Sequence, residues 1–286
     1  MTTATLTLAR DGIFPITQSA DDEVVMPVSG LSVAGTIQGE GIYAGVPSLF
    51  VRLQGCNLRC IWADSKQHAQ TCDTAYTSLF PTEAKQVSVE YIYKTLKINR
   101  GKINHVVITG GEPLLQSASL LTLVDKLQSD NWLITIETNG TVWNEQVVQI
   151  IPKIALLSIS PKLPSSTPTI EKLEQLGIEP TEATRRHSSI ISDVEPLKNI
   201  VRAAHTHDTN YQLKFVVSTP NDESDIHNIL GSLPLESEQH VVVMPMGTDA
   251  HEMHAAALAA TEMAIRNGWR YSPRLHIDIF GNKEGV

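Results

Sequence analysis

Several features of membrane-bound, secreted and nucleic-acid-binding proteins are missing from this sequence. No apolar run approaches the roughly 20 residues that a helix needs to cross a bilayer, and the start of the chain lacks a basic segment followed by an apolar signal core. Basic residues are few, 22 Lys and Arg against 31 Asp and Glu, which disfavours broad binding to phosphate backbones or anionic membrane surfaces. We therefore expect a cytoplasmic protein that acts on a small molecule and binds neither nucleic acid nor membrane.

Cysteine is also scarce, with three residues in a chain of 286. Disulfides cannot pair an odd number completely, and all three cysteines lie between residues 56 and 72. A reducing compartment and free thiolates suit this arrangement better than a disulfide framework.

The 42% of hydrophobic residues are enough for one sizeable core. From residue 48 onward, β-rich runs alternate with amphipathic helical patterns, which predicts βα units and a parallel sheet. Strands are expected at 48–53, 105–110, 133–138, 155–160, 211–217 and 240–245, and helices at 88–98, 115–129, 144–151, 194–207, 222–230 and 251–267. Such units are too few for a closed eight-stranded barrel, so the predicted fold is α/β, a partial and open TIM-like (β/α)6 barrel.

Some boundaries and irregular stretches can also be predicted. Ser192 and Glu195 indicate a capping box before one helix, and Gly268 indicates the end of another. Residues 163–190, rich in Pro, Ser, Thr and Glu, are expected to be irregular, and residues 1–30 show no strong pattern. We treat 1–30 as an N-terminal extension and 31–286 as a single domain, and we expect no catalytic role for 1–30 or 163–190.

The cysteines occur in the stretch CNLRCIWADSKQHAQTC at 56–72, separated by three residues and then by eleven. Three thiolates do not complete the four-ligand shell of an electron-transfer cluster, so one metal position stays free for an outside ligand. A [4Fe–4S] cluster with one open iron is one interpretation. A zinc site completed by His68 is equally compatible with the spacing. Cysteines that merely fill a core are disfavoured, because the flanking residues are polar.

Further motifs lie at the ends of the predicted strands. They are QGEG at 38–41, GVPSLFVRLQGCNLRC at 45–60, CDT at 72–74, ITGGEPLLQ at 108–116, IETNG at 136–140, SISPKL at 158–163, QLKFVV at 212–217 and SPRLHIDIFGNKEGV at 272–286. Together and in this order they resemble the radical S-adenosylmethionine (SAM) superfamily, and more narrowly the 7-carboxy-7-deazaguanine synthase family. The resemblance covers about residues 31–286 and implies an open barrel of the radical SAM type.

The chain departs from the usual superfamily spacing at the third cysteine. Ala63 stands where that cysteine is expected, and Cys72 restores the CDT motif after an insertion at 61–71. Because extra loop residues add little closure cost, Cys72 can serve as the third ligand.

The resemblance implies two cofactors. In the family, three cysteines, here Cys56, Cys60 and Cys72, hold a [4Fe–4S] cluster whose open iron binds SAM, and reduction then yields a 5′-deoxyadenosyl radical. The residues expected to bind SAM by resemblance are Thr71, Cys72, Asp73, Gly111, Glu112, Asn139, Ser160, Pro161 and Lys162.

The substrate that the resemblance implies is 6-carboxy-5,6,7,8-tetrahydropterin. Arg52, in the strand before Cys56, would pair with the substrate carboxylate through a two-pronged guanidinium contact. Thr74 is the expected ligand of Mg²⁺, shared with substrate oxygens. Other substrate contacts are expected from Ile37, Gln38, Gly39, Thr109 and Val286, the last through its terminal carboxylate.

The implied activity is that of a carbon–nitrogen lyase, which converts the carboxytetrahydropterin to 7-carboxy-7-deazaguanine with loss of ammonia, in queuosine and 7-deazapurine biosynthesis. A flavodoxin-type electron donor and a homodimer follow from the same resemblance. Two other functions have to be distinguished from it. A radical SAM activating enzyme would need an open groove for a protein substrate, and a non-enzymatic zinc-binding module would hold zinc without sulfide.

Overall fold

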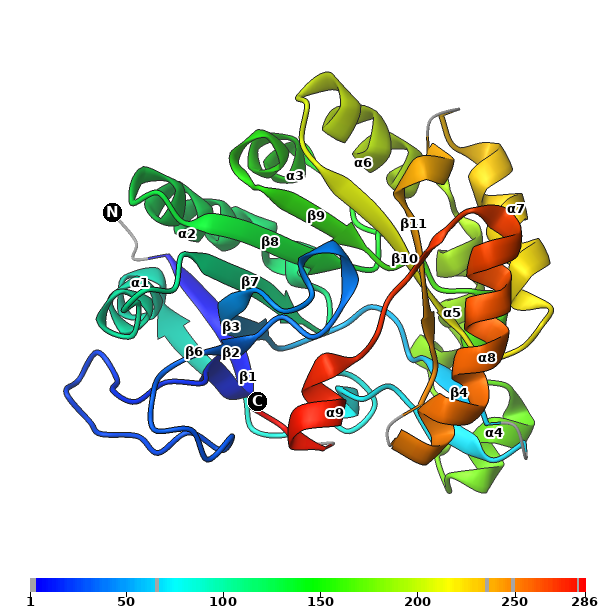
Figure 1. The fold of residues 1–286 in the computed structure, drawn as a ribbon, viewed down its shortest axis with the longest axis horizontal. Helices are drawn as coiled ribbons and strands as arrows, with labels where there is room; N and C mark the ends of the chain where they lie inside the picture. The colour runs from blue at the N-terminus through cyan, green and yellow to red at the C-terminus, as the bar shows by residue number, and fades with distance from the viewer. Residues whose placement is uncertain (1–3, 65–66, 235–236, 248–249, 282) are drawn as a thin grey trace.

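Six parallel strands form the centre of one sheet in the computed structural model, which describes residues 4–64, 67–234, 237–247, 250–281 and 283–286 (Figure 1). In sheet order these strands are β3 (Pro47–Leu53), β7 (His105–Gly110), β8 (Leu133–Thr138), β9 (Leu156–Ile159), β10 (Tyr211–Val217) and β11 (Val241–Pro245). Each of the six matches a predicted strand within one residue. The short strand β12 (Arg270–Tyr271) pairs in parallel with β11 at one edge, so the sheet stays open, as predicted.

The opposite edge of the sheet comes from the start of the chain. Strand β1 (Thr5–Phe14) lies antiparallel to β3 on one side and to β6 (Lys85–Ser88) on the other. Strand β2 (Thr36–Ile37) also pairs with β3. Residues 1–30 lack a strong strand pattern because the register of β1 shifts between Leu8 and Ile13. Gly12, with φ of +54°, interrupts the alternation there. The N-terminal extension thus contains a ten-residue strand of the main sheet.

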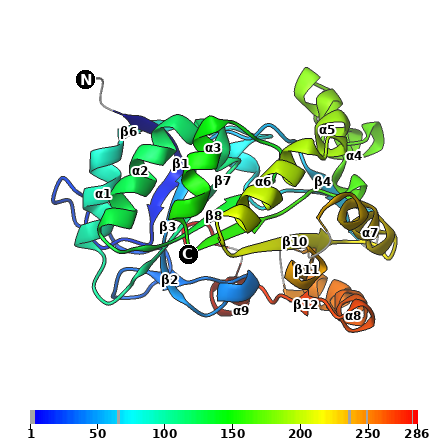
Figure 2. The ribbon, with the colours of Figure 1, turned by 90° about the horizontal axis from the view of Figure 1, so that it is seen from above.

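Helices cover the outer face of the sheet (Figure 2). They are α1 (Val89–Ile98), α2 (Ser117–Ser129), α3 (Glu145–Ile150), α6 (Glu195–Thr206), α7 (Asp222–Ser232) and α8 (Ala250–Asn267), which agree with the predicted helices. Gly268, with φ of +71°, follows α8 and confirms the predicted helix end. The predicted capping box is wrong: Ser192 is the last residue of another helix, and α6 begins after Val194 without a side-chain cap.

The segment 163–190 is more regular than predicted, because it contains α4 (Ile170–Gln175) and most of α5 (Glu182–Ser192). The insertion at 61–71 forms a hairpin of β4 (Ile61–Ala63) and β5 (Ala69–Thr71). These two parts of the chain are joined by Lys172, whose Nζ donates to the backbone oxygens of Ile61, Ser165 and Thr167 at 2.7–2.9 Å. The remaining elements are α9 (Leu275–Phe280) and short 3-10 helices at Gly41–Tyr43, Ala75–Thr77, Pro113–Gln116, Ile151–Lys153, Pro164–Ser166 and Ser237–His240.

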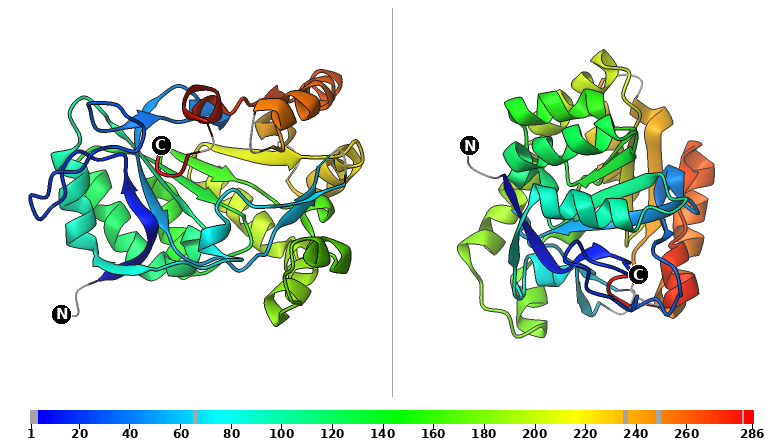
Figure 3. Two further views of the ribbon diagram at one scale, coloured as in Figure 1. Left: turned by 90° about the horizontal axis from the view of Figure 1, so that it is seen from below. Right: turned by 90° about the vertical axis from the view of Figure 1, so that its left-hand side faces the viewer.

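The two faces of the sheet differ in chemistry because side chains alternate along each strand. The outward positions of β3, β7, β8, β9 and β10 belong to one large apolar core with the helices, which includes Leu49, Val51, Leu53, Val106, Ile108, Ile134, Ile136, Leu157, Ile159, Leu213 and Phe215. The inward positions are largely polar and include Ser48, Arg52, His105, Thr109, Thr135, Glu137, Ser158, Gln212 and Lys214. The last residues of the chain lie within the curve of the sheet (Figure 3). No helix in the described part of the chain is long and apolar enough to cross a bilayer.

Candidate active site

A row of polar side chains crosses the inner face of the sheet from β3 to β10. Arg52 is the register partner of Thr109, and Ser158 is the partner of both Glu137 and Gln212. Thr109 Oγ1 donates to Glu137 Oε2 at 2.7 Å, and Gln212 Nε2 donates to Ser158 Oγ at 2.7 Å. Because these two pairs are hydrogen-bonded, the orientations of their donors and acceptors are restricted.

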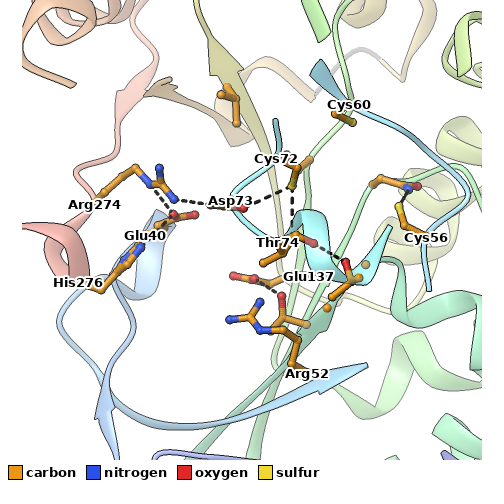
Figure 4. Close-up of a pocket in the computed structure, with 18 of the residues that line it drawn as sticks. Glu40, Arg52, Cys56, Cys60, Cys72, Asp73, Thr74, Glu137, Arg274 and His276 are labelled. Atoms are coloured by element: carbon orange, nitrogen blue, oxygen red, sulfur yellow. Dashed lines mark hydrogen bonds and ion pairs between the residues drawn. The ribbon is translucent and has the colours of Figure 1, made fainter. Parts of the chain in front are cut away.

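Arg52, Thr109, Glu137 and Ser158 of this row line a cavity that is shared with the three cysteines (Figure 4). Most of the residues predicted from the sequence line it: Ile37, Gln38, Gly39, Arg52, Cys56, Cys60, Thr71, Cys72, Asp73, Thr74, Thr109, Gly111, Asn139, Ser160, Lys162 and Val286. Two predicted SAM ligands, Glu112 and Pro161, are not among the lining residues. Gln38 Nε2 donates to Glu137 Oε1 at 3.1 Å, so Glu137 connects two of the predicted substrate-binding residues.

The insertion brings Cys72 back beside Cys60. Ile61 pairs with Thr71 in the β4–β5 hairpin, so the two cysteines lie just outside its last paired positions. Ala63 pairs instead with Ala69 within the hairpin. The hairpin therefore compensates for the eleven-residue separation by returning the chain to its starting point.

The positions of the three cysteines and of His68 favour a cluster over a zinc site completed by His68. All three border the cavity, and burial raises the pKa of each thiol, that of Cys72 to about 12. His68, the candidate zinc ligand, has a side chain that is 71% exposed and contacts Asp64. Buried thiols arranged around a cavity, without a fourth protein ligand at His68, match the donor set of an iron–sulfur cluster with an open position.

Two glycines allow the loop after β7 to pack against the loop that carries Cys56. A Cβ on Gly111 would lie 2.1 Å from the backbone oxygen of Gly55, and one on Gly110 would lie 2.1 Å from that of Leu53. Gly110 also has φ of +140°, which L side chains rarely adopt. Gly111 is expected to bind SAM by resemblance, and the structure shows that it packs closely against the cysteine loop.

Glu112 is buried behind the cavity lining, and its contact with SAM stays a prediction. Its side chain is completely buried and accepts hydrogen bonds from Leu114 N at 2.9 Å, Thr138 Oγ1 at 2.8 Å and Asn139 N at 2.7 Å. Burial raises the pKa of its carboxyl group. Asn139 in turn donates to Asn57 Oδ1 at 2.9 Å. Glu112 thus ties the ends of β7 and β8 to the cysteine loop from behind the cavity wall.

A buried ion network, which the sequence analysis did not identify, forms another wall of the cavity (Figure 4). Glu40 contacts both Lys214 Nζ and Arg274 Nε, and Arg274 Nη2 also contacts Asp73 Oδ2 beside Cys72. Burial disfavours the charged form of Glu40, but Lys214 and Arg274 outweigh it and hold the pKa of this carboxyl far below its usual range. Both Glu40 and Arg274 occur in motifs noted above, QGEG and SPRLH. These motifs were the signal from which the two residues could have been identified as part of the site.

Arg52 borders the cavity but already has a partner in the protein. Its Nε donates to Asp11 Oδ2 at 2.6 Å, and the Tyr76 hydroxyl donates to the same oxygen at 2.9 Å. Asp11 belongs to β1, the strand that the sequence analysis missed. The ring of Phe14, on the same strand, lies 5.0 Å from the Arg52 guanidinium carbon.

An open parallel α/β barrel with three cysteines at its cavity is the architecture of a radical SAM protein, and the Radical SAM superfamily profile matches residues 50–208. The chain is therefore a member of this superfamily, which uses a [4Fe–4S] cluster and SAM.

Its relatives define the family further. The chain is 35% identical to 7-carboxy-7-deazaguanine synthase of Halobacterium salinarum, over 94% of this chain and 98% of that protein. It is 33% identical to the protein of the same name from Rhodopirellula baltica, over 87% of this chain and 85% of that one. The chain belongs to the 7-carboxy-7-deazaguanine synthase family, as its motifs predicted. The crystal structure of QueE from Escherichia coli has the same fold, with a TM-score of 0.54 at 24% identity over 91% of this chain and 93% of that chain.

Proposed function

We propose that this protein is a radical SAM lyase that converts 6-carboxy-5,6,7,8-tetrahydropterin to 7-carboxy-7-deazaguanine with loss of ammonia. The observation that carries the proposal is that the three cysteines share one cavity with Arg52, Thr109, Glu137 and Ser158 of the polar row. The overall conversion removes ammonia and needs no net oxidant. The convergence of Arg52, Thr74 and the last residue on this cavity favours a small substrate over a protein substrate.

Cys56, Cys60 and Cys72 would hold the cluster, and its open iron would bind SAM. When bound, this pair of groups supplies reductive cleavage of SAM and hence hydrogen abstraction from the substrate. The chain supplies position and exclusion of water. The side chains proposed to face SAM are Thr71, Asp73, Asn139, Ser160 and Lys162, with backbone from Gly111. Lys162 Nζ donates to Ser160 Oγ at 2.7 Å, which holds the turn around Pro161 in shape.

The substrate would lie along the polar row. We propose that Ile37, Gln38, Gly39, Thr109 and Val286 contact it and that Arg52 pairs with its carboxylate. Glu137 is a further candidate, because an acceptor held by Gln38 and Thr109 suits the amino edge of a pterin. Thr74 would contribute one hard oxygen to Mg²⁺, with substrate oxygens and water as the other ligands. Magnesium should therefore bind appreciably only together with substrate.

The family resemblance also supports a flavodoxin-type electron donor, a homodimer and a cytoplasmic location, which we propose on that basis. Because β1 pairs with β3 in the main sheet, we propose that the single catalytic domain includes the N-terminal strand as well as residues 31–286.

The test is anaerobic incubation of the purified protein with reductant, SAM, Mg²⁺ and carboxytetrahydropterin, followed by mass detection of the deazaguanine product. The expected result is a brown protein with iron and sulfide, and product that forms only when all components are present. Omission of Mg²⁺ should lower product formation at limiting substrate and leave the iron content unchanged. A protein that contains zinc without sulfide, or a loaded enzyme that forms no product, would refute the proposal.

A further inference from the structure

The N-terminal strand contributes a buried acidic residue that reaches the cavity only through another side chain. Asp11 does not line the cavity, whereas its partner Arg52 does. Asp11 Oδ2 accepts from Arg52 Nε and from the Tyr76 hydroxyl, and Asp11 Oδ1 is buried without a partner among the described residues. Arg52 thus contributes a single nitrogen, Nε, to the ion pair with Asp11.

An ion pair made through Nε leaves the two terminal guanidinium nitrogens of Arg52 available to a ligand. Among the described residues, Nε is the one Arg52 nitrogen that has a hydrogen-bond partner in the protein. A guanidinium can bind a carboxylate with two nitrogens at once, and that geometry requires a fixed plane. Asp11 at Nε and the Phe14 ring at 5.0 Å both restrict this plane.

The surroundings give Arg52 other possible partners. Glu137 lies on the same row of the sheet, one strand beyond Thr109 (Figure 4), and Asp73 is close enough to raise the pKa of Arg52. Without Asp11, a flexible and largely buried arginine would turn toward one of these carboxylates. A guanidinium already paired in that way would have fewer nitrogens left for a ligand.

We propose that Asp11 is a positioning residue: it holds Arg52 so that the terminal guanidinium nitrogens face the cavity and bind the carboxylate of the substrate. The inference rests on the proposed function, since it takes the substrate to be an anionic pterin. It gives strand β1 a role in substrate binding, although β1 lies outside the repeating βα units.

The test measures equilibrium binding of carboxytetrahydropterin to the cluster-loaded, SAM-bound enzyme without reductant, so that no turnover occurs. Asp11→Ala should raise the Kd about 10-fold or more, because a charge-assisted hydrogen bond is lost. Asp11→Asn, which can still accept from Nε, should have a smaller effect. A tetrahydropterin that lacks the carboxylate should bind the wild type and Asp11→Ala almost equally. Equal weakening for both ligands, or tighter binding of the natural ligand, would overturn the proposal.

A double-mutant cycle separates positioning from direct contact. If Asp11 acts through Arg52, the variant with both Asp11→Ala and Arg52→Ala should bind no more weakly than Arg52→Ala alone. Additive losses would show that Asp11 acts independently and would contradict the inference. Asp130→Asn is the matched control, because Asp130 also pairs with an arginine, Arg100, outside the cavity. Its Kd should equal that of the wild type.

Loss of the fold is monitored by iron content and thermal midpoint in every variant. If Asp11→Ala does not fold, Tyr76→Phe provides a second test: it removes one hydrogen bond from Asp11 Oδ2 and should weaken binding of the carboxylated ligand only. An unchanged Kd in Tyr76→Phe together with an unchanged Kd in Asp11→Asn would overturn the proposal. Product formation by the wild type tests the proposed function separately, so either idea can fail without the other.

Discussion

Protonation of the buried His105 should make the folded state less stable in mild acid. His105 is 1% exposed on the inner face of the sheet, between Ser48 Oγ at 2.7 Å from Nδ1 and Thr135 Oγ1 at 2.8 Å from Nε2. The Ser48 hydroxyl donates to Val46 O, so Nδ1–H donates to Ser48 and Nε2 accepts from Thr135. A second proton on Nε2 would have to reverse the Thr135 hydroxyl in a buried site.

The size of the effect follows from the pKa of His105, which burial lowers from 6.5 to about 4 despite the opposing influence of Glu137. Because the pKa of this base is lower in the folded state, its contribution to stability is present above 6.5 and is lost as the pH falls toward 4. Between about pH 7.5 and about pH 5, the loss should be about 2 kcal/mol.

The assay is an NMR titration of the imidazole signals, in which the His105 resonance is identified by its absence from His105→Gln. The expected midpoint is about 4. Urea unfolding of the two proteins should also show a pH dependence that is smaller in His105→Gln, by about 2 kcal/mol across this range. A His105 midpoint near 6.5, or identical pH dependence in the two proteins, would refute the reasoning.

Three other changes test the cluster loop and the end of the chain. Cys72→Ala should abolish cluster binding while Ala63→Ser leaves it intact, as measured by iron and sulfide per chain; a cluster retained in the Cys72 variant would mean that another residue supplies the third ligand. Gly111→Ala should destabilise the protein by about 1–3 kcal/mol, because the new Cβ would lie 2.1 Å from the backbone oxygen of Gly55, and an unchanged thermal midpoint would contradict this packing. A short extension after Val286 should raise the substrate Kd without changing the iron content, and an unchanged Kd would exclude the chain end from the substrate site.

The strands and helices of the βα units were predictable because their apolar faces repeat without interruption. In β1, the irregular register around Gly12 removes that signal, and its pairing partner β3 lies about 40 residues away, beyond the reach of a local pattern. The helices α4 and α5 were missed because polar and helix-breaking residues dominate the composition of 163–190. The stability of α4 comes partly from tertiary contacts such as that of Lys172 with Ile61 in the β4–β5 hairpin.

The cavity was predictable from motifs, but the partners of its charged residues were not. The GGEP motif alone does not show whether its glutamate contacts a ligand or is buried, as Glu112 is. The same loop sequence is compatible with either position. The Arg274–Asp73 contact joins residues 201 positions apart, so no spacing in the sequence could indicate it. Only the fold shows which carboxylates remain available to a ligand.

The N-terminal strand illustrates how elements outside the βα units can shape the site. One residue of β1, Asp11, pairs with Arg52, and its neighbour Arg10 pairs with Glu284, two residues before Val286. The Arg10 contact is solvent-exposed and contributes little stability by itself, whereas Arg52 and Asp11 are both largely buried. Breaking the buried pair leaves an uncompensated charge inside the protein, so loss of Asp11 should cost more stability than loss of Arg10. Arg52 and the chain end thus depend unequally on β1, and the dependence should be stronger at Arg52.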